Sequence, residues 1–335
     1  MLSPNSQDLT LRLQETMHYI LQHYETPPTE NILLTATRYA LSHNGKMLRG
    51  RMLLEVCRAL AGTNEHALFA AAAVEYLHLG TLLHDDIIDQ DELRRGVPAV
   101  WKQFSPDLAL LSGDLLYFAA YQFLARSFAD TSSPSTARAL HLFSTACMDL
   151  CFGQALEEKL VGKLSDDYPH YHEDYLEIVR LKTSSLFRAA LQMGTLLGGG
   201  SNEQIEAMGR FAEHLGVAFQ MVDDLLPFTS SAQTIGKPVT SDIKNHRLTA
   251  PILYAFAAAD EADRHTLYAV YRDGQFDEEL INAHTLITEV LKHTDALHLT
   301  RVAAAQHRQQ AVNELLCLPD NDARDFLRSI ANQLV

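Results

Sequence analysis

The sequence predicts an all-α protein, and two observations carry that prediction. Apolar residues recur at three- and four-residue spacing along almost all of the 335 residues, which is the period of a helix with one buried face. Alternating polar and apolar runs, typical of half-buried strands, are absent. Helix punctuation agrees, and we expect about a dozen helices, with starts near Thr29, Ser105-Pro106, Ser133-Pro134 and Asn202-Glu203 and a stop at Gly198-Gly199-Gly200.

The chain is expected to form a single helical domain over residues 1–335. Its 47% hydrophobic content is ample for a packed core, and no fixed-period repeat or long flexible linker is visible. The most apolar stretch, Ala67 to Leu83, is interrupted by Glu75 and His78, so we interpret it as a buried helix and expect no membrane span. Thr229 to Arg247 is the best candidate for an irregular loop.

Charge and cysteine usage narrow the class of protein. A formal charge of -15, from 42 acidic and 27 basic residues, disfavours nucleic acid as a partner. The four cysteines (Cys57, Cys147, Cys151 and Cys317) contain no CxxC pair, so we expect reduced core thiols. The first 25 residues lack a basic start followed by an apolar run, and we therefore expect no secretory signal and a cytoplasmic protein.

Two aspartate-rich segments stand out within apolar, helix-patterned sequence: residues 84–89 (His-Asp-Asp-Ile-Ile-Asp) and residues 220–224 (Gln-Met-Val-Asp-Asp). Clustered carboxylates repel one another, and burying them without partners costs many kcal/mol, so such segments require bound cations or basic side chains. Oxygen-only ligands suit Mg²⁺, and no Cys or His set of zinc type accompanies them.

The first segment has the geometry of a metal-binding pair. On a helix from about Ala70 to Gln90, Asp85 and Asp89 share one face and lie about 6 Å apart along the axis. Arg94 and Arg95 follow within a few residues, and a guanidinium matches phosphate oxygens in two-point contact. The alternatives are a solvated acidic helix end and a solvated arginine pair.

His78 on the same helix face is open to two other interpretations. It is compatible with a core histidine hydrogen-bonded to backbone. Glu75-x-x-His78 also matches the helical di-iron motif, which requires a second Glu-x-x-His. The chain has none, and this weighs against an oxidase.

The run from Glu75 through Asp85 and Asp89 to Arg94-Arg95-Gly96-x-Pro98 resembles the first aspartate-rich motif of the trans-isoprenyl diphosphate synthases. Further matches follow in family order over roughly residues 40–255: Gly45-Lys46-x-Leu48-Arg49, Ser112-Gly113-Asp114, Gly153-Gln154, Lys182-Thr183, Leu215-Gly216 with Gln220-x-x-Asp223-Asp224, and Gly236-Lys237-Pro238. The resemblance implies a single bundle of mostly antiparallel helices around a deep central cavity, in a homodimer.

The resemblance also implies roles for individual residues. Asp85 and Asp89 would bind two Mg²⁺ ions and Asp223 a third, all on the diphosphate of an allylic substrate. The basic partners of that diphosphate would be Arg94, Lys182, Lys237 and Arg247, the last where the family more often has lysine. The residues implied for the diphosphate of isopentenyl diphosphate are Gly45, Lys46, Arg49, His78 and Arg95.

The implied reaction extends a prenyl chain. Ionisation of the allylic carbon–oxygen bond would leave a carbocation, which the isopentenyl double bond attacks, and loss of a proton gives a product five carbons longer. Gln220 and Thr183 would orient the substrate and steady the cation, with helix packing as the alternative role for Thr183.

Four features depart from the family's pattern. Pro227 replaces the third aspartate of the second motif, and we expect the helix to bend or end near Leu226 because proline cannot donate to the carbonyl of Asp223. Thr240 replaces a glycine, residues 245–247 replace a more acidic segment, and Gly50-Arg51 replaces a common proline. These changes favour, modestly, a slow enzyme or a partner subunit.

Product length is predicted from Gly80 and Thr81, which lie five and four residues before Asp85, about 6 to 7.5 Å deeper along the helix. Small residues at this depth leave room for a long tail, so we predict a C25–C40 product that Gly80→Phe would shorten. Four residues are candidates for the end of a deeper cavity for the tail, with a role as ordinary core residues as the alternative: Leu77, Phe118, Met148 and Phe152.

Three alternatives are kept. A short-chain synthase would stop at C15 or C20, as farnesyl or geranylgeranyl diphosphate synthases do. A weakly active subunit of a heteromeric synthase would be expected to lose carboxylates or basic residues that this chain retains. A terpene cyclase is disfavoured by Gly45, Lys46, Arg49, His78 and Arg95, because a cyclase has no second diphosphate to hold.

Overall fold

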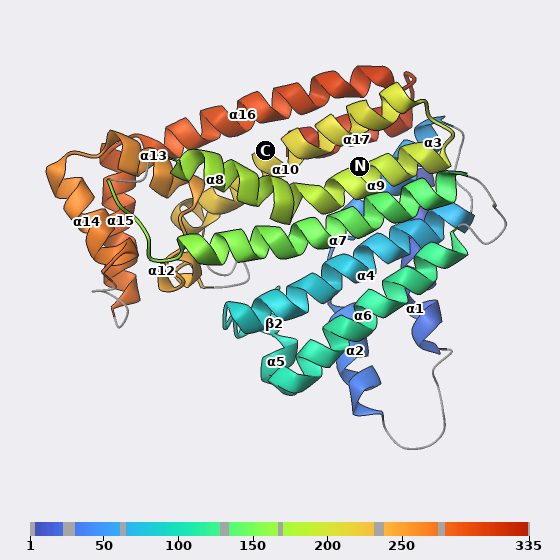
Figure 1. Cartoon of the computed structure of the whole chain (residues 1–335), viewed down its shortest axis with the longest axis horizontal. Helices are drawn as coiled ribbons and strands as arrows, with labels where there is room; N and C mark the ends of the chain where they lie inside the picture. Colours follow the sequence, from blue (N-terminus) through green and yellow to red (C-terminus); the bar gives the residue numbers. More distant parts are fainter. Residues whose placement is uncertain are drawn as a thin grey trace. The chain divides into compact units, whose positions relative to one another are not determined.

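The computed structural model describes residues 4–22, 31–60, 65–127, 134–166, 170–230, 238–273 and 279–333. Within them the protein is almost entirely helical (Figure 1), which confirms the predicted class. The strands are two residues each, β1 (Leu93–Arg94) and β2 (Val97–Pro98). The helices are α1 (Pro4–Gln22), α2 (Ile32–Ser42), α3 (Leu48–Leu60), α4 (Glu65–Ile88), α5 (Val100–Gln103), α6 (Pro106–Arg126), α7 (Pro134–Leu160), α8 (Tyr171–Ile178), the π-helix η1 (Val179–Ser184), α9 (Ser185–Leu197), α10 (Asn202–Thr229), α12 (Ser241–Lys244), α13 (Ala250–Ala258), α14 (Glu261–Tyr271), α15 (Leu280–His293), α16 (Ala296–Glu314), the 3-10 helix η2 (Leu315–Cys317) and α17 (Asp322–Gln333).

The predicted helix starts that fall within the described residues, and the predicted stop at the three glycines, agree with the structure. Helix α6 begins at Pro106, and the Ser105 hydroxyl caps it by accepting from the backbone N–H of Leu108 at 3.2 Å. Helices α7 and α10 begin at the predicted positions, and α9 ends just before the three glycines. Thr29 lies outside the described residues; the next helix, α2, is capped by Asn31 instead.

The chain contacts divide the molecule into two compact units. Unit 1 comprises Met1–Cys147, Leu186–Ala212 and Val312–Ile330, and unit 2 comprises Met148–Ser185, Glu213–Ala311 and Ala331–Val335. Helices α7 and α10 each contribute residues to both units. The single domain expected from the sequence is therefore still a prediction.

Unit 1 is built around α4, which packs most extensively on α6 and then on α3 (Figure 1). Both α4 and α6 are long and apolar enough to cross a membrane by length and composition alone. In α4, however, 72% of the apolar window is buried inside the protein. The interpretation of this segment as a buried helix is thus confirmed. Only 44% of the window in α6 is buried.

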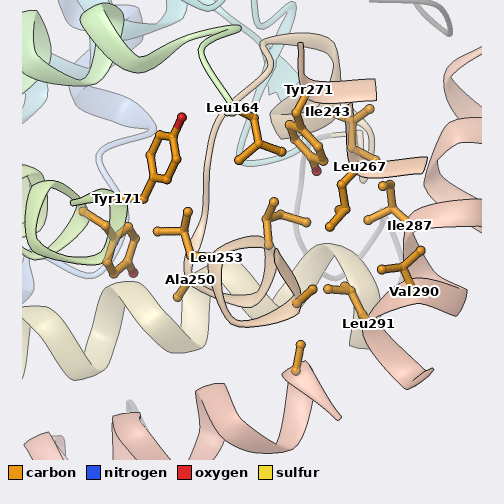
Figure 2. Packing of buried hydrophobic residues seen from close by; sticks show 14 of the residues in the cluster. Leu164, Tyr171, Ile243, Ala250, Leu253, Leu267, Tyr271, Ile287, Val290 and Leu291 are labelled. Atoms are coloured by element: carbon orange, nitrogen blue, oxygen red, sulfur yellow. The ribbon is translucent and has the colours of Figure 1, made fainter. Parts of the chain in front are cut away.

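Unit 2 has its own hydrophobic core, shown in Figure 2. Tyr271 of α14, Ile287 of α15 and Ile252 of α13 are among its most buried members. Apolar side chains from six further segments complete it. Helices α12 and α13 both pack on α15, which anchors α12 to this core. The loop predicted over Thr229–Arg247 therefore contains a short helix, α12.

A small hairpin at residues 93–98 was not predicted. Strands β1 and β2 are antiparallel, with Leu93 opposite Pro98 and Arg94 opposite Val97. The turn between them is Arg95-Gly96, and both residues have positive φ, 55° and 80°. That combination defines the tight hairpin turn whose twist matches the strands. A non-glycine residue in this region is uncommon and strained, and such residues cluster at functional sites.

Candidate active site

The end of α4 presents two of the three motif carboxylates together. The backbone N–H of Asp89 donates to the carbonyl of Asp85 at 2.8 Å, so the helical turn continues through both residues. Asp85 is half-buried and Asp89 is 8% exposed. Asp86 is directed elsewhere: its carboxylate forms a buried ion pair with Arg94. Burial raises the pKa of Asp86 to about 6, although Arg94 opposes that shift.

The donor set of this helix end fits a hard divalent cation. Asp85 and Asp89 offer only carboxylate oxygens, which suit Mg²⁺ or Ca²⁺ better than softer metals. Among the described residues no group of three or more His, Cys, Asp or Glu side chains is placed to hold a metal ion. An ion held here would take its remaining ligands from water or from a phosphate, which is how Mg²⁺ is usually bound.

The hairpin positions the two arginines on different partners. Arg94 Nε donates to Asp86 Oδ1 at 2.8 Å, and Arg94 Nη2 lies 3.8 Å from Asp91. Although burial disfavours its charge, these carboxylates raise the pKa of Arg94. Arg95 Nη1 instead donates to the carbonyl of His43 at 2.5 Å. The predicted contact of Arg94 with a substrate diphosphate is untested, and the structure gives Arg94 a carboxylate partner in the same motif.

A basic cluster in unit 1 unites most residues predicted to hold the second diphosphate. Arg49 Nη1 lies 3.2 Å from His78 Nε2, and the Arg49 guanidinium covers the Phe187 ring at 4.2 Å. A Cβ placed on Gly45 would lie 2.6 Å from Arg95 Cζ, so Gly45 is also in contact with the cluster. Lys46 is exposed in the turn that precedes α3.

Burial and neighbouring positive charges lower the pKa values of Arg49 and His78 in this cluster. Burial, followed by the neighbouring Arg95, lowers the pKa of Arg49 to about 10, despite the opposing field of Glu75. Burial and the three arginines Arg49, Arg95 and Arg94 lower the pKa of His78 well below its ordinary value. His78 is therefore neutral. Since arginine can only donate, His78 Nε2 accepts from Arg49 and the ring proton lies on Nδ1.

Glu75 explains one departure from the family's pattern. Its carboxylate is 3% exposed and accepts from the backbone N–H of Gly50 at 2.7 Å. Burial raises the pKa of Glu75, and that hydrogen bond and Arg49 oppose the shift. A proline at position 50 would have no N–H to donate to this buried carboxylate. The glycine therefore supplies a hydrogen bond that the more common residue cannot make.

Gly80 does not border open space, so the reason given for its role from the sequence was wrong. A Cβ at this position would lie 2.6 Å from Tyr117 Cε1 and 3.1 Å from the carbonyl of Gly113. Gly80 is thus the point where α4 and α6 cross closely. Thr81 is half-buried, and its hydroxyl donates to the carbonyl of His78 at 2.7 Å. Of the two residues, Thr81 is the better candidate for a contact with substrate.

The proposed floor residues also fall into two groups. Leu77 is 4% exposed and belongs to the core. Phe118, Met148 and Phe152 are exposed at 71%, 54% and 63%, so the alternative that they are ordinary core residues is wrong for all three.

Lys182 and Thr183 lie in η1, a π-helical stretch between α8 and α9. Single π-helical turns inside α-helices are frequent at functional sites. Two glycines allow other helices to approach this turn. A Cβ on Gly153 of α7 would lie 2.7 Å from the backbone nitrogen of Lys182, and a Cβ on Gly216 of α10 would overlap Ser184. The two glycine motifs therefore allow α7 and α10 to pack closely on the turn that carries Lys182.

Sequence reasoning missed Glu157, which is central to the basic residues of unit 2. Lys182 Nζ lies 2.7 Å from Glu157 Oε2, and Arg247 Nη2 lies 3.4 Å from the same oxygen. All three side chains are largely buried. Glu157 follows the Gly153-Gln154 motif by one helical turn, and that spacing was the available signal. The structure thus unites Lys182 with Arg247, as the resemblance implies, and adds a shared carboxylate.

Polar residues of the second acidic motif form a hydrogen-bonded chain. The Thr183 hydroxyl donates to Gln220 Oε1 at 2.8 Å, and Gln220 Nε2 donates to Asp224 Oδ1 at 2.8 Å. Asp224 is 4% exposed, whereas Asp223 is exposed on the adjacent face of α10. The two neighbouring aspartates therefore differ in exposure.

Pro227 lies inside the last turn of α10, and its carbonyl has a hydrogen-bond partner. The helix continues to Thr229, and the Ser230 N–H donates to the carbonyl of Leu226 at 2.9 Å. The Pro227 carbonyl accepts from His284 Nε2 at 2.8 Å. This contact links the last turn of α10 to α15. Lys237 and Gly236 lie outside the described residues, while Thr240 is buried and Arg247 is fixed by its contact with Glu157.

Comparison with known proteins identifies the class. The family model described as polyprenyl synthetase matches residues 30–287. The chain is 34% identical over 304 residues to the short chain isoprenyl diphosphate synthase of Methanothermobacter thermautotrophicus, covering 91% of this chain and 90% of that protein. It is 32% identical to the geranylfarnesyl diphosphate synthase of Natronomonas pharaonis, covering 90% and 89%. A heptaprenyl diphosphate synthase component 2 from Geobacillus stearothermophilus is 30% identical, covering 88% and 87%.

Solved structures give the same result. The polyprenyl synthase of Caulobacter crescentus, in a complex with calcium and isoprenyl diphosphate, superimposes with a TM-score of 0.83 at 28% identity over 98% of this chain and 96% of that one. The chain therefore has the all-α isoprenoid synthase fold. It belongs to the polyprenyl synthetase family and is a trans-prenyltransferase.

Proposed function

We propose that this protein condenses isopentenyl diphosphate with an allylic prenyl diphosphate, in a reaction that depends on Mg²⁺. The observation that carries the proposal is the presence of two separate sets of charged residues. One is the Arg49–His78–Arg95 cluster of unit 1, and the other is formed by Lys182, Arg247 and their shared partner Glu157 in unit 2. A reaction between two diphosphates needs both sets, whereas a cyclase with one diphosphate does not.

The chemistry needs concentrated positive charge on a leaving group. When the allylic carbon–oxygen bond breaks, the diphosphate gains negative charge, and preorganised cations stabilise that change. Divalent ions, when bound, supply most of this charge as Lewis acids. Lys182 and Arg247 contribute fixed positive charges, Arg49 and Arg95 hold the second diphosphate, and Lys237 is proposed as a further basic partner. Neutral His78 can donate one hydrogen bond from Nδ1.

We assign the ions to the three aspartates that the resemblance implies. Asp85 and Asp89 are proposed to bind two Mg²⁺ ions and Asp223 a third. The carboxylates of Asp86 and Asp224 are proposed to act through Arg94 and Gln220, with which they interact in the structure. The calcium in the Caulobacter complex supports a divalent ion for this family. The number three rests on the resemblance.

A product of C25–C40 is proposed, with C15 or C20 as the alternative. The relatives include both short-chain and long-chain synthases by name, so the product length has to be determined from residues of this protein that line the path of the prenyl tail. The proposal places the tail beside Thr81, one helical turn before Asp85.

Thr81→Phe is expected to shorten the main product by one or more five-carbon units, because the ring would occupy the space beside the tail. Product length is read by reversed-phase chromatography after dephosphorylation. The control is Leu11→Phe, at an exposed position of α1, which should leave the products unchanged. An unaltered distribution in Thr81→Phe would remove this residue from the tail's path. Gly80→Phe is not a clean test, since it would collide with Tyr117.

A homodimer through α6 is proposed from its exposed apolar residues. Phe118 is 71% exposed, and Leu110, Leu111 and Tyr121 of the same helix are also exposed. Apolar patches on this scale mark interaction sites. A second copy of the chain is the occupant we propose, since the apolar residues would cover one another across a two-fold axis.

Phe118→Glu is expected to convert the dimer to a 37.4 kDa monomer in sedimentation velocity, because it would place two carboxylates in an apolar interface. Leu316→Glu is the matched control: that residue is 73% exposed and lies on η2. A dimer that persists in Phe118→Glu, or a monomeric parent protein, would refute the assignment of this surface.

The second candidate function is a component of a heteromeric synthase, favoured by the relative named as a component of heptaprenyl diphosphate synthase. One assay separates the two. Purified protein is incubated with Mg²⁺, labelled isopentenyl diphosphate and separate C5, C10, C15 and C20 primers. Elongation by the protein alone, abolished by EDTA, is the expected result. Activity only after addition of a second chain would favour the component, and a cytoplasmic location is expected in either case.

A further inference from the structure

The buried carboxylate of Asp224 has no direct role in the proposed binding of ions, yet it is surrounded by hydrogen-bond donors. Tyr175 of α8 donates its hydroxyl to Oδ2 at 2.8 Å, and the backbone N–H of Ala250, at the start of α13, donates to the same oxygen at 3.0 Å. Gln220 Nε2 donates to Oδ1 at 2.8 Å. All of these residues belong to unit 2.

These contacts fix the orientation of the Gln220 amide. Because Gln220 Nε2 donates to Asp224 Oδ1, the NH₂ end of the amide faces Asp224. The carbonyl end therefore faces Thr183, and the single hydroxyl proton of Thr183 is committed to Gln220 Oε1 at 2.8 Å. The remaining valences of the Thr183 oxygen are lone pairs, so the oxygen can only accept a hydrogen bond or contact a positive charge.

We propose that Asp224 is a positioning residue that, through Gln220, commits the Thr183 hydroxyl oxygen to face the positive charge that develops on the substrate. The inference rests on the proposed function, because a positive charge at carbon arises only if an allylic diphosphate ionises. Lys182 precedes Thr183 in η1 and is proposed to contact the departing diphosphate. Thr183 then directs its hydroxyl oxygen toward the carbon atom that the diphosphate leaves.

The variant Asp224→Asn tests the direction of the chain. An asparagine has one acceptor, and the two donors Tyr175 and Ala250 N–H compete for it together. Its NH₂ group would then face Gln220, the Gln220 amide would reverse, and the Thr183 proton would point toward the substrate. We expect kcat to fall about tenfold to hundredfold, as for the loss of one preorganised dipole, with the KM of both substrates within about threefold of the parent.

The double variant Asp224→Asn with Gln220→Glu exchanges the carboxylate and the amide at constant charge. The new carboxylate accepts from the asparagine NH₂ and from the Thr183 hydroxyl, so the original orientation of Thr183 returns. We expect kcat to recover at least tenfold over Asp224→Asn. A purely structural role for Asp224 would not predict this recovery, because the double variant changes Gln220 as well and does not restore Asp224.

Thr183 provides a second readout. Thr183→Ser retains the hydroxyl and should keep most of kcat, whereas Asp224→Asn added to Thr183→Val should cause no loss beyond that of Thr183→Val. The inference is overturned if Asp224→Asn retains full kcat, if the double variant is no better than the single one, or if the losses with Thr183→Val multiply. Should Asp224→Asn not fold, a folded double variant within about tenfold of the parent kcat supports the inference and an inactive one overturns it. An inactive parent protein would instead refute the proposed function.

Discussion

Replacing Asp89 with asparagine is expected to lower kcat/KM for prenyl transfer about a thousandfold, the largest effect of any single change discussed here. The amide retains the size of the side chain but removes one of two carboxylates at the end of α4. A group that stabilises charge in the transition state is worth about a hundredfold to a thousandfold in rate, and a weakened ion adds to that loss. Steady-state kinetics over a range of Mg²⁺ concentrations measure it.

The control for Asp89 must separate metal binding from general charge. Asp8→Asn removes an exposed carboxylate from α1 and should leave kcat/KM unchanged. If Asp89→Asn keeps its thermal midpoint but loses activity, and high Mg²⁺ restores part of it, the carboxylate acts on the ion. Activity near that of the parent at low Mg²⁺ would contradict the assignment.

Lys182→Ala is expected to lower kcat about a hundredfold while leaving the KM for isopentenyl diphosphate within about threefold. The ammonium is held by Glu157 at 2.7 Å, and its removal takes a positive charge from the departing allylic diphosphate. Lys159→Ala, an exposed lysine of α7, is the matched control. Single-turnover kinetics with saturating isopentenyl diphosphate separate the chemical step from binding.

Glu157 decides whether the lysine acts on substrate or only stabilises the fold. If Lys182 served mainly as a structural partner of Glu157, then Glu157→Gln and Lys182→Ala would lose activity equally. We expect Glu157→Gln to lose less than tenfold, because both Lys182 and Arg247 remain. Equal losses in the two variants, with equal falls in the thermal midpoint, would place Lys182 outside the chemistry.

Much of the architecture could be predicted from the sequence because its signals are local. Helix starts depend on a cap and a proline, as at Ser105-Pro106, and the pairing of Asp85 with Asp89 depends only on helical period. The end of α10 was predicted only approximately for the same reason. Proline is a local signal for a bend or an end near Leu226, whereas the helix continues to Thr229 and His284 of α15 contacts the Pro227 carbonyl.

The parts that could not be predicted depend on contacts between distant residues. Asp85 and Asp86 are adjacent residues of the same type, so the sequence alone does not distinguish their roles. The hairpin at Arg95-Gly96 places Arg94 in an ion pair with Asp86. Glu157 lies 25 residues from Lys182, and Tyr175 lies 49 residues from Asp224. Gly80 was interpreted as open space because glycine has no side chain. The sequence does not show that Tyr117, 37 residues later, packs against this position.

The central proposal, which the resemblance implies, is that Asp85, Asp89 and Asp223 bind divalent ions together with the allylic diphosphate, and crystallography tests it most directly. Crystals would be grown with Mn²⁺ and an allylic thiolodiphosphate, which ionises too slowly to react, and anomalous diffraction would locate the ions. We predict manganese peaks within about 2.3 Å of carboxylate oxygens of Asp85, Asp89 and Asp223, with the diphosphate bound to the same ions. A bound diphosphate without manganese at these three side chains would contradict the account.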